Sequence, residues 1–383
     1  MTIDTTPMGT VDDADWRGLA HDIGNSLRSG VAERDLTGEI AVTAFESLRT
    51  RGVTGALVPV EFGGGGASHA DMGEMLRVIG SYDPATAVTL SMHSHVVAMQ
   101  VWRHNHGMDA SGIFRKVIDD GAVLVSTGGS DWLSSNGSAR RVEGGYRITA
   151  RKSPASGCEV GTLLATSIRW DDAPEGPQVL HCVVPCSAEG VSIELTWDTL
   201  GLRATGSHTV VLDDVFVADA AVSLTRPADR WHPTWNIIVG AAIPLIMSAY
   251  VGIADAAVAS ACASMAGRGE PHVLQLLGEM ANAHTTAADL VAAMFVDADN
   301  LRFDNTDAHA SRTLSRKTVA TDALIDTVRL ALEVTGGGGY TRSSDIERLY
   351  RDVHGALFHP LPRAKQTSLS GRVALGLSPV DER

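Results

Sequence analysis

The feature that most constrains the fold is a block of short, strand-like segments between two helical blocks. From about residue 121 to residue 226, runs rich in Val, Ile, Leu and Thr alternate with polar residues and are separated by turn residues. Alternation of this kind is typical of half-buried β-strands. Six or more such runs in roughly a hundred residues predict a small β-barrel or sandwich.

The blocks on either side carry apolar residues at helical spacing. Before the strands, amphipathic segments surround one evenly apolar segment at residues 85–102, which indicates a buried helix. After the strands come three long, Ala-rich segments whose small side chains allow close helix packing. The predicted architecture is an α+β multidomain chain: an N-terminal α-helical domain (1–120), a middle β domain (121–226) and a C-terminal four-helix bundle (227–383).

Charge and hydropathy exclude several partner classes. The 383 residues carry a net charge of −14, and no run of Lys or Arg exceeds two. This balance argues against nucleic acid or an anionic membrane surface as the main partner. The longest apolar stretch, residues 237–261, is interrupted by Pro244, Ser248 and Asp255, so it predicts a buried bundle helix rather than a membrane span.

The termini and cysteines favour a cytoplasmic protein. Residues 1–16 have neither the basic nor the apolar part of a secretory signal. The four cysteines form no CxxC pair and no cluster with histidines at metal-ligand spacing. We therefore expect free thiols in a reducing cytoplasm and no bound metal.

Three strings carry a resemblance to a known family. They are GVTGALVPVEFGGGGAS (52–68), TLGLRATGSHTVVLDDVFVAD (199–219) and LEVTGGGGYTRSSDIERLYRDV (332–353). In this order they resemble the N-domain, the end of the β domain and the bundle signature of the acyl-CoA dehydrogenase superfamily. The resemblance implies a flavin, normally FAD, between the β domain and the bundle, and a homodimer or homotetramer. It also implies an acyl-thioester substrate and a redox partner, either an electron-transfer flavoprotein or a flavin reductase.

Two segments of the β domain match family positions that contact the flavin. STGGSD (126–131) stands where relatives have a longer TEPxxGSD loop. KSPASG (152–157) replaces KxWITN, with Pro154 in place of the aromatic residue and Ser156 keeping a hydroxyl for the flavin edge. The resemblance therefore implies flavin contacts by Ser156 and by three residues of the first segment: Thr127, Gly129 and Ser130.

Other positions match family contacts less completely. Arg268 remains from a bundle motif that reaches the FAD of a neighbouring subunit. The glycine run after the third long helical segment matches a loop that approaches the flavin diphosphate, although a plain helix stop explains it equally well: Gly336, Gly337 and Gly338. Arg203 and Asn236 match neighbourhoods that lie near substrate in relatives, and a surface role for Arg203 stays open.

The residue expected to act as catalytic base is missing. Most of the family continues from the YRD motif to YEGT, whose Glu removes an α-proton from the acyl thioester. Here His359 stands at the Tyr position and Pro360 at the Glu position. Some relatives hold the Glu on the first bundle helix instead, and that neighbourhood contains Trp235 and Asn236 and no acid in this chain. A positioned base contributes about 10²–10⁴ in rate, so the protein uses another base or performs different chemistry. His359 is the nearest candidate, and a surface His-Pro turn is the alternative.

Three functions fit these observations. We favour an FAD-dependent oxidoreductase of acyl-CoA dehydrogenase type that acts on a thioester of CoA or a carrier protein with an unusual base. The second is a two-component monooxygenase on the same fold, which takes reduced flavin from a separate reductase. In that case His93 or His95, together with Ser156 and His359, would assist at the flavin edge. The third is a pseudoenzyme subunit that binds partners without catalysis.

Overall fold

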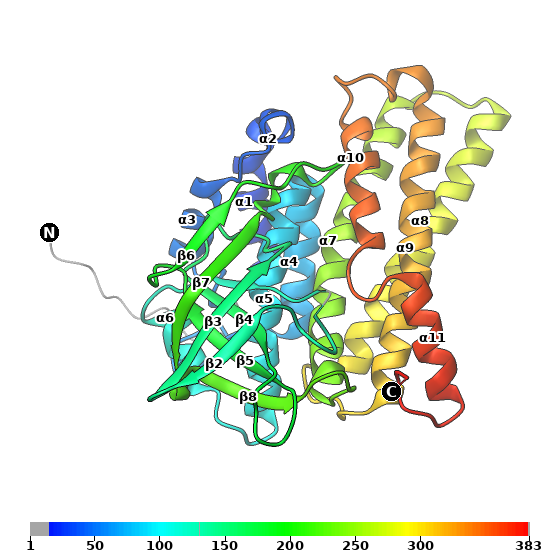
Figure 1. Ribbon diagram of the computed structural model, residues 1–383. Helices are drawn as coiled ribbons and strands as arrows, with labels where there is room; N and C mark the ends of the chain where they lie inside the picture. Colours follow the sequence, from blue (N-terminus) through cyan, green and yellow to red (C-terminus); the bar gives the residue numbers. More distant parts are fainter. Residues whose placement is uncertain (1–14, 130, 382–383) are drawn as a thin grey trace, which may run out of the picture.

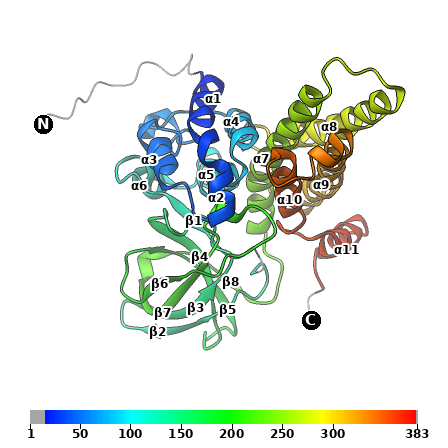
Figure 2. The same cartoon turned by 90° about the horizontal axis from the view of Figure 1, so that it is seen from above.

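The computed structural model describes residues 15–129 and 131–381, and it shows three blocks in the predicted order. Figure 1 shows the N-terminal helices in blue and cyan, the strands in green and the C-terminal helices in yellow to red. Figure 2 shows the strands and the C-terminal helices on different sides of the N-terminal block. The N-terminal residues examined for a secretory signal lie mostly outside the described residues.

The N-terminal block is helical, and side-chain caps begin its two longest helices. Ser68 and Asp71 form a capping box at the start of one, and Asp83 with Pro84 begins the next. The latter helix is buried along most of its length, as its even apolarity predicts. The helices are α1 (Trp16–Leu27), α2 (Val31–Thr37), α3 (Val42–Thr50), α4 (His69–Tyr82), α5 (Pro84–Asn105) and α6 (Ser111–Ile118).

The middle block is a sandwich of two four-stranded sheets. One sheet has the order β1-β4-β5-β8 and the other β2-β3-β7-β6, and only the β1–β4 pair is parallel among the described pairs. Inward-facing apolar residues of both sheets form a core of their own, separate from the helical core. The strands are β1 (Leu124–Ser126), β2 (Ser138–Val142), β3 (Gly145–Lys152), β4 (Leu163–Trp170), β5 (Gln178–Pro185), β6 (Val191–Glu194), β7 (Thr209–Ala218) and β8 (Val222–Pro227).

The C-terminal block is built around one long helix. This helix, α7, packs against α4 and α5 on one side and against α8, α9 and α10 on the other, as both views show. It is long and apolar enough to cross a membrane, but 89% of its most apolar window is buried inside the protein. The helices are α7 (Thr234–Ser264), α8 (Pro271–Ala298), α9 (Asp307–Thr335), α10 (Asp345–Val353) and α11 (Arg363–Ala374).

Two glycines allow the backbones of α4 and α7 to touch. A Cβ at Gly252 would lie 2.1 Å from the carbonyl oxygen of Arg77, and a Cβ at Gly80 would lie 2.5 Å from that of Ala249. No larger residue fits at either position without moving backbone. The N-terminal helices and the bundle consequently share a single hydrophobic core.

Two local expectations differ from the structure. The pattern around Ser344 predicts a capping box with Glu347, but Ser344 accepts only from the backbone N–H of Ile346, and Glu347 pairs with Arg351 instead. Arg351 and Asp352 do not pair with each other as their adjacency suggests. Arg351 binds Asp35 and Glu347, because successive helical residues point to different faces.

Candidate active site

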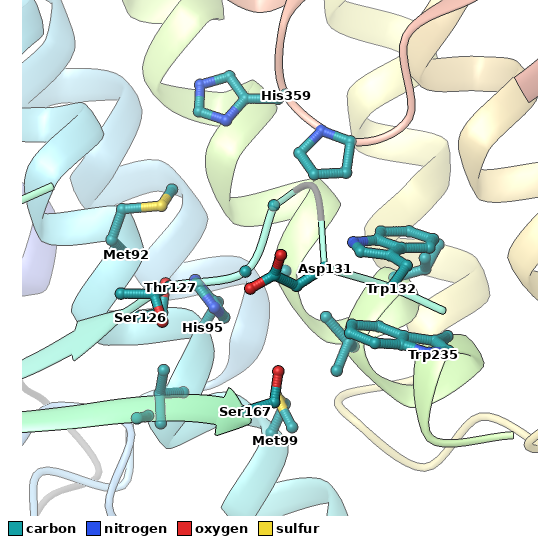
Figure 3. A pocket seen from close by; sticks show the side chains of 18 of the residues that line it. Met92, His95, Met99, Ser126, Thr127, Asp131, Trp132, Ser167, Trp235 and His359 are labelled. Atoms are coloured by element: carbon teal, nitrogen blue, oxygen red, sulfur yellow. The ribbon is translucent and has the colours of Figure 1, made fainter. Parts of the chain in front are cut away.

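A cleft of about 2100 Å³ lies where the β domain meets the helices. Residues of α5, β1, β4, β5 and α7 form its walls, together with the loops at 197–207 and 354–362. Figure 3 shows His359 above the loop of Asp131, with Met92 on one side of the view and Trp132 and Trp235 on the other. Five of the candidate flavin-contact or proton-transfer residues from the sequence line this cleft: His95, Thr127, Gly129, Ser156 and His359.

A chain of hydroxyl groups orients Ser156. Ser207 Oγ donates to Ser156 Oγ at 2.8 Å, and Thr205 Oγ1 lies 2.6 Å from Ser207 Oγ. Because Ser207 supplies the proton in its bond to Ser156, the hydroxyl hydrogen of Ser156 is free to donate into the cleft. The sequence pointed to Ser156, whereas the supporting pair lies about fifty residues further along the chain.

The loop that carries Thr127 and Gly129 is held from behind by a buried ion pair. Lys152 Nζ lies 2.6 Å from Asp131 Oδ2 and 3.2 Å from Ser135 Oγ, and both members of the ion pair are buried. Burial lowers the pKa of Lys152, and the nearby Asp131 carboxylate opposes that shift. Asp131 therefore anchors this loop. Ser130, the remaining residue singled out in the loop, lies outside the described residues.

His359 makes a hydrogen bond with a buried tyrosine. The hydroxyl of Tyr250, on α7, lies 2.8 Å from His359 Nε2. Burial raises the pKa of Tyr250 well above its usual value, so the phenol stays protonated. Its O–H has no other acceptor among the described residues, and a buried donor is normally satisfied, which assigns Tyr250 as the donor to Nε2. The ring proton of a neutral His359 must then sit on Nδ1. Burial, with smaller contributions from Lys317 and His95, lowers the pKa of His359 to about 3, so the imidazole stays neutral near pH 7.

Lys317 supports the backbone of the same loop. Its side chain is buried on α9, and Nζ donates to the carbonyl oxygen of His359 at 2.9 Å. Burial lowers the pKa of Lys317 to about 8. The alternative of a His-Pro turn with an exposed ring does not describe His359, because Tyr250 and Lys317 hold it from two helices.

The two histidines of α5 have different environments. His93 accepts from the N–H of Leu124 at Nδ1, and its Nε2 lies 2.8 Å from the carbonyl oxygen of Thr54. Both nitrogens are therefore used inside the core, and His93 does not line the cleft. His95 does line it. Its Nδ1 lies 3.2 Å from the carbonyl oxygen of Ser91, while Nε2 is open to the cleft. The structure thus favours His95 over His93 as the residue that meets a ligand.

The remaining candidates lie away from the cleft. Arg203 donates to the carbonyl oxygens of Asp35 and Thr199 and pairs with Asp198, so it ties together backbone segments. Asn236 is buried and donates to Asp307 at 2.9 Å. Neither faces the cavity as the resemblance suggests, because Trp235 takes the inward position at the start of α7.

The family contacts expected from the bundle also lie elsewhere. Arg268 is exposed in the turn between α7 and α8, and the glycine run is exposed just after α9: Gly336, Gly337 and Gly338. Because α8 runs antiparallel to its neighbours, both features lie at the same end of the bundle (Figure 1), and neither lines the cleft. Within one chain they do not meet the cleft residues.

An aromatic wall was missed in the sequence. The indoles of Trp132 and Trp235 stack with ring centroids 4.9 Å apart and planes 6° from parallel, and Trp231 lies 5.8 Å from Trp132. A signal was available, because aromatic residues make up only 5% of the chain. Trp132 directly follows the GGSD segment, and Trp235 lies in the segment where some relatives hold the catalytic Glu. No carboxylate lines the cleft along α7 among the described residues.

Comparisons with known proteins identify the class of protein. Two sequence models match the chain: acyl-CoA dehydrogenase, N-terminal domain, at residues 23–107, and acyl-CoA dehydrogenase, C-terminal domain, at residues 245–362. The chain belongs to the acyl-CoA dehydrogenase family.

Particular relatives show the range of functions within this family. The amino sugar nitrososynthase DnmZ of Streptomyces peucetius is 27% identical over 92% of this chain and 90% of its own length. The putative acyl-CoA dehydrogenase YdbM of Bacillus subtilis is 26% identical over 90% of this chain and 92% of its own. The structure of KijD3 with FMN and a dTDP-amino-keto sugar superposes with a TM-score of 0.84 at 25% identity and covers 99% of this chain and 98% of that one. These findings make the protein a flavin-dependent oxidoreductase rather than a non-catalytic subunit.

The cleft residues fit a flavin. Ser156 presents a hydroxyl hydrogen with no protein acceptor among the described residues, and the apolar ring of Pro154 lines the cleft near it. On the loop before Asp131, Gly128 has a φ of +102°, a conformation that favours glycine and leaves this backbone free of side chains. Ser156, Thr127 and the backbone of Gly129 would hold the ring, and the bound flavin would supply the two-electron chemistry.

Proposed function

We propose that this protein is a monooxygenase that uses reduced flavin, most simply FMN, supplied by a separate flavin reductase. The observation that carries the proposal is the residue found at each of the two positions where dehydrogenases of this family hold their catalytic Glu. Pro360 lines the cleft where a dehydrogenase needs its glutamate, and Trp235 lines it at the other position. Without a carboxylate there, α-proton removal from an acyl thioester lacks its base.

The groups that do face the cleft suit proton management around oxygen chemistry. His359 offers an N–H at Nδ1, and His95 offers a lone pair at Nε2. Ser156 offers a hydroxyl hydrogen aimed into the cleft. Neutral donors and acceptors of this kind can hold a proton near a developing charge without adding a fixed charge of their own. Two relatives support a monooxygenase that uses FMN: DnmZ is named an amino sugar nitrososynthase, and the structure of KijD3 contains FMN.

Tyr250 and Lys317 act through His359. Tyr250 fixes the tautomer by donating to Nε2, and Lys317 fixes the loop by binding the carbonyl oxygen. We assign both as positioning residues. His95 is only 8% exposed, and a hydrogen bond made in such a low-polarity environment is stronger than one made in water.

The proposal includes a second copy of the chain. Arg268 and the glycine run lie exposed at one end of the bundle, where the family resemblance implies contacts to a neighbouring subunit's flavin. A homodimer or homotetramer would bring these groups to a cleft that they cannot reach within one chain. We also infer a cytoplasmic location, because the four cysteines are free and reduced flavin is supplied there by soluble reductases.

The test uses flavin and oxygen alone. The protein is loaded with reduced FMN under nitrogen and mixed rapidly with oxygenated buffer while the flavin spectrum is followed. Return of the oxidised spectrum in two phases, with an absorbance that belongs to neither oxidised nor reduced flavin between them, supports the monooxygenase. Single-phase return, combined with reduction of bound flavin by an acyl-CoA panel, supports the dehydrogenase instead.

A further inference from the structure

One part of the cleft is lined by apolar and aromatic side chains from α5, α7 and the loop after β1. We call this part the apolar subpocket, and its lining residues are Met92, Val96, Met99, Trp132, Trp235 and Ile238. Figure 3 shows four of them around the same space: Met92, Met99, Trp132 and Trp235. Flexible thioethers on one wall and flat rings on the other fit a planar apolar ligand.

The tryptophan pair forms a fixed, flat surface. The rings of Trp132 and Trp235 are 7% and 5% exposed and are nearly parallel, so neither can rotate freely. The guanidinium of buried Arg226, on β8, lies 5.4 Å from the centroid of the Trp235 ring, on α7, and supports this ring from the side of the sandwich. A fixed aromatic surface favours stacking with a second ring, which contributes beyond simple area burial.

Charged ligands find no counter-ion in the apolar subpocket. The cleft-lining residues of α5 from Met92 to Met99 and of α7 from Trp235 to Ile246 include no Asp, Glu, Lys or Arg. Asp131 lies nearby but is already bound by Lys152. A diphosphate or carboxylate placed there would lose its hydration without an ion pair in return, which is costly. This part of the cleft therefore disfavours a charged group and favours a neutral one, and the cations that line the cleft lie outside it, among them Arg103, Lys116 and Arg372.

His95 supplies a hydrogen-bond acceptor beside these apolar walls. Burial lowers its pKa to about 4, so the ring is neutral near pH 7. With Nδ1–H donating to the carbonyl oxygen of Ser91, Nε2 carries a lone pair that faces the cleft. A ligand that places an N–H or O–H against Nε2 satisfies this acceptor, and a ligand without a donor leaves it unpaired.

We propose that the substrate is a neutral, planar aromatic ring that carries an N–H or O–H donor, stacked on the Trp132–Trp235 pair and anchored by His95. The inference rests on the proposed monooxygenase function and names its substrate class. In the reaction, reduced flavin gives two electrons to O₂. One oxygen atom is inserted into a C–H bond of the ring to form a hydroxyl group, the other leaves as water, and the flavin returns oxidised.

The first test measures binding to the protein loaded with oxidised FMN by isothermal titration calorimetry. Indole and benzothiophene have nearly the same shape, but only indole has an N–H donor. Indole should bind about tenfold more tightly, a ratio that corresponds to about 1.4 kcal/mol. Phenol should bind more tightly than cyclohexanol, which is not planar, and dTDP should bind weakly. Tight binding of dTDP with no measurable binding of indole or phenol would overturn the proposal.

Variants of the two contacts separate stacking from hydrogen bonding. Trp235→Leu should weaken both indole and benzothiophene, and Trp235→Phe should restore most of the affinity because it keeps a ring. His95→Leu should weaken indole by about tenfold and leave benzothiophene unchanged, since only the donor contact is lost. Trp170→Phe is the matched control, because Trp170 packs against Tyr146 inside the sandwich. Equal effects of His95→Leu on both ligands would contradict the assigned hydrogen bond.

Failure of this inference is distinguishable from failure of the proposed function. Oxidation of protein-bound reduced FMN by oxygen needs no substrate, so its two-phase course tests the function alone. Two-phase oxidation without aromatic binding would refute the substrate class and leave the monooxygenase standing. Aromatic binding with single-phase oxidation would refute the monooxygenase and, with it, the hydroxylation step.

Discussion

The phenol oxygen of Tyr250 lies 2.8 Å from Nε2 of His359, and this contact joins the central helix of the core to the loop that closes the cleft. The two side chains come from separate regions of the sequence, and neither has another side-chain partner of this kind among the described residues. With Tyr250 assigned as the donor in this contact, the ring proton of neutral His359 is assigned to Nδ1. The cleft therefore contains an imidazole N–H whose direction is set by the fold.

We expect Tyr250→Phe to reduce oxygenation without unfolding the protein. Loss of the hydroxyl frees His359 to adopt the other tautomer, so its N–H no longer points reliably into the cleft. Hydroxylated product per reduced flavin consumed should fall about tenfold. His359→Ala should cost at least as much, and His359→Gln should recover part of the loss because it keeps an N–H donor. The control is His104→Ala, since His104 pairs with Glu61 at the surface. Unchanged coupling in both Tyr250→Phe and His359→Ala would remove this pair from the mechanism.

The decline of activity at alkaline pH should reflect the deprotonation of Lys317. Its pKa is lowered to about 8, so it is charged at pH 7 and loses its proton as the pH rises through 8. The charge-assisted bond to the carbonyl oxygen of His359 then weakens, and activity should decline above pH 8. Lys317→Met should lower activity at pH 7 and abolish this alkaline limb. On the acid side, no limb near pH 6.5 is expected, because His359 has a pKa of about 3 and His95 of about 4. A limb at pH 6.5 would show that one of these rings ionises.

Stability should fall as the pH is lowered from 6.5 towards 4. Burial lowers the pKa of at least five histidines, to about 4 for His69, His93 and His95 and to about 3 for His181 and His359. Between their folded and unfolded pKa values the unfolded chain binds more protons, so acid favours unfolding by about 1.4 kcal/mol per pH unit for each ring. Urea unfolding at pH 7 and pH 5 measures the change. His69→Gln should reduce the pH dependence by about a fifth of this sum, whereas exposed His272→Gln should leave it unaltered.

Breaking the buried Lys152–Asp131 ion pair, which holds the loop of Thr127 and Gly129, should lower the free energy of unfolding. Lys152→Met leaves Asp131 buried without its cation, and loss of one partner of such a pair destabilises by about 3–5 kcal/mol. The unfolding free energy should fall by that amount, and FMN affinity should fall with it because the loop carries Thr127 and Gly129. The double variant Lys152→Met with Asp131→Leu should recover much of the stability, since no charge is left unpaired. A double variant as unstable as the single one would mean that packing, rather than charge, dominates.

Arg268 should contribute to flavin binding only in the assembled oligomer. If a neighbouring copy places Arg268 at the cleft, Arg268→Ala should raise the Kd for FMN about tenfold, as expected for loss of one charge-assisted contact, with little change in Tm. The matched control is Arg17→Ala, because Arg17 is likewise exposed but lies on α1. Light scattering gives the oligomeric state of both variants. A monomer with full flavin affinity would refute the contribution from a second copy.

The fold could be predicted from the sequence because the spacing of apolar residues indicates helices and strands even when no contacts are known. The alternation between residues 121 and 226 and the Ala-rich segments after them each reflect which side chains face a core. The N-cap at Ser344 is confirmed, but its completion to a capping box was wrong because Glu347 pairs with Arg351, which only the folded chain reveals.

The site was only partly accessible. Ser156 and His359 could be found because they replace residues of recognisable motifs. Tyr250 could not, because it lies within a uniformly apolar helix where nothing marks its hydroxyl as used. His93 and His95 sit two positions apart on α5, so they point to different faces, and sequence spacing alone does not say which face meets the cleft.

Because α4 and α7 approach each other closely at Gly80 and Gly252, the structural units of the molecule differ from the three blocks of its sequence. Three blocks of sequence form two cooperative bodies, since the helical blocks share one core while the sandwich keeps its own. The cleft lies at the seam between these two bodies. A small rigid-body rotation of the sandwich would change the width of the cleft without melting any helix or strand, and we expect flavin and product to pass through the cleft by such a movement.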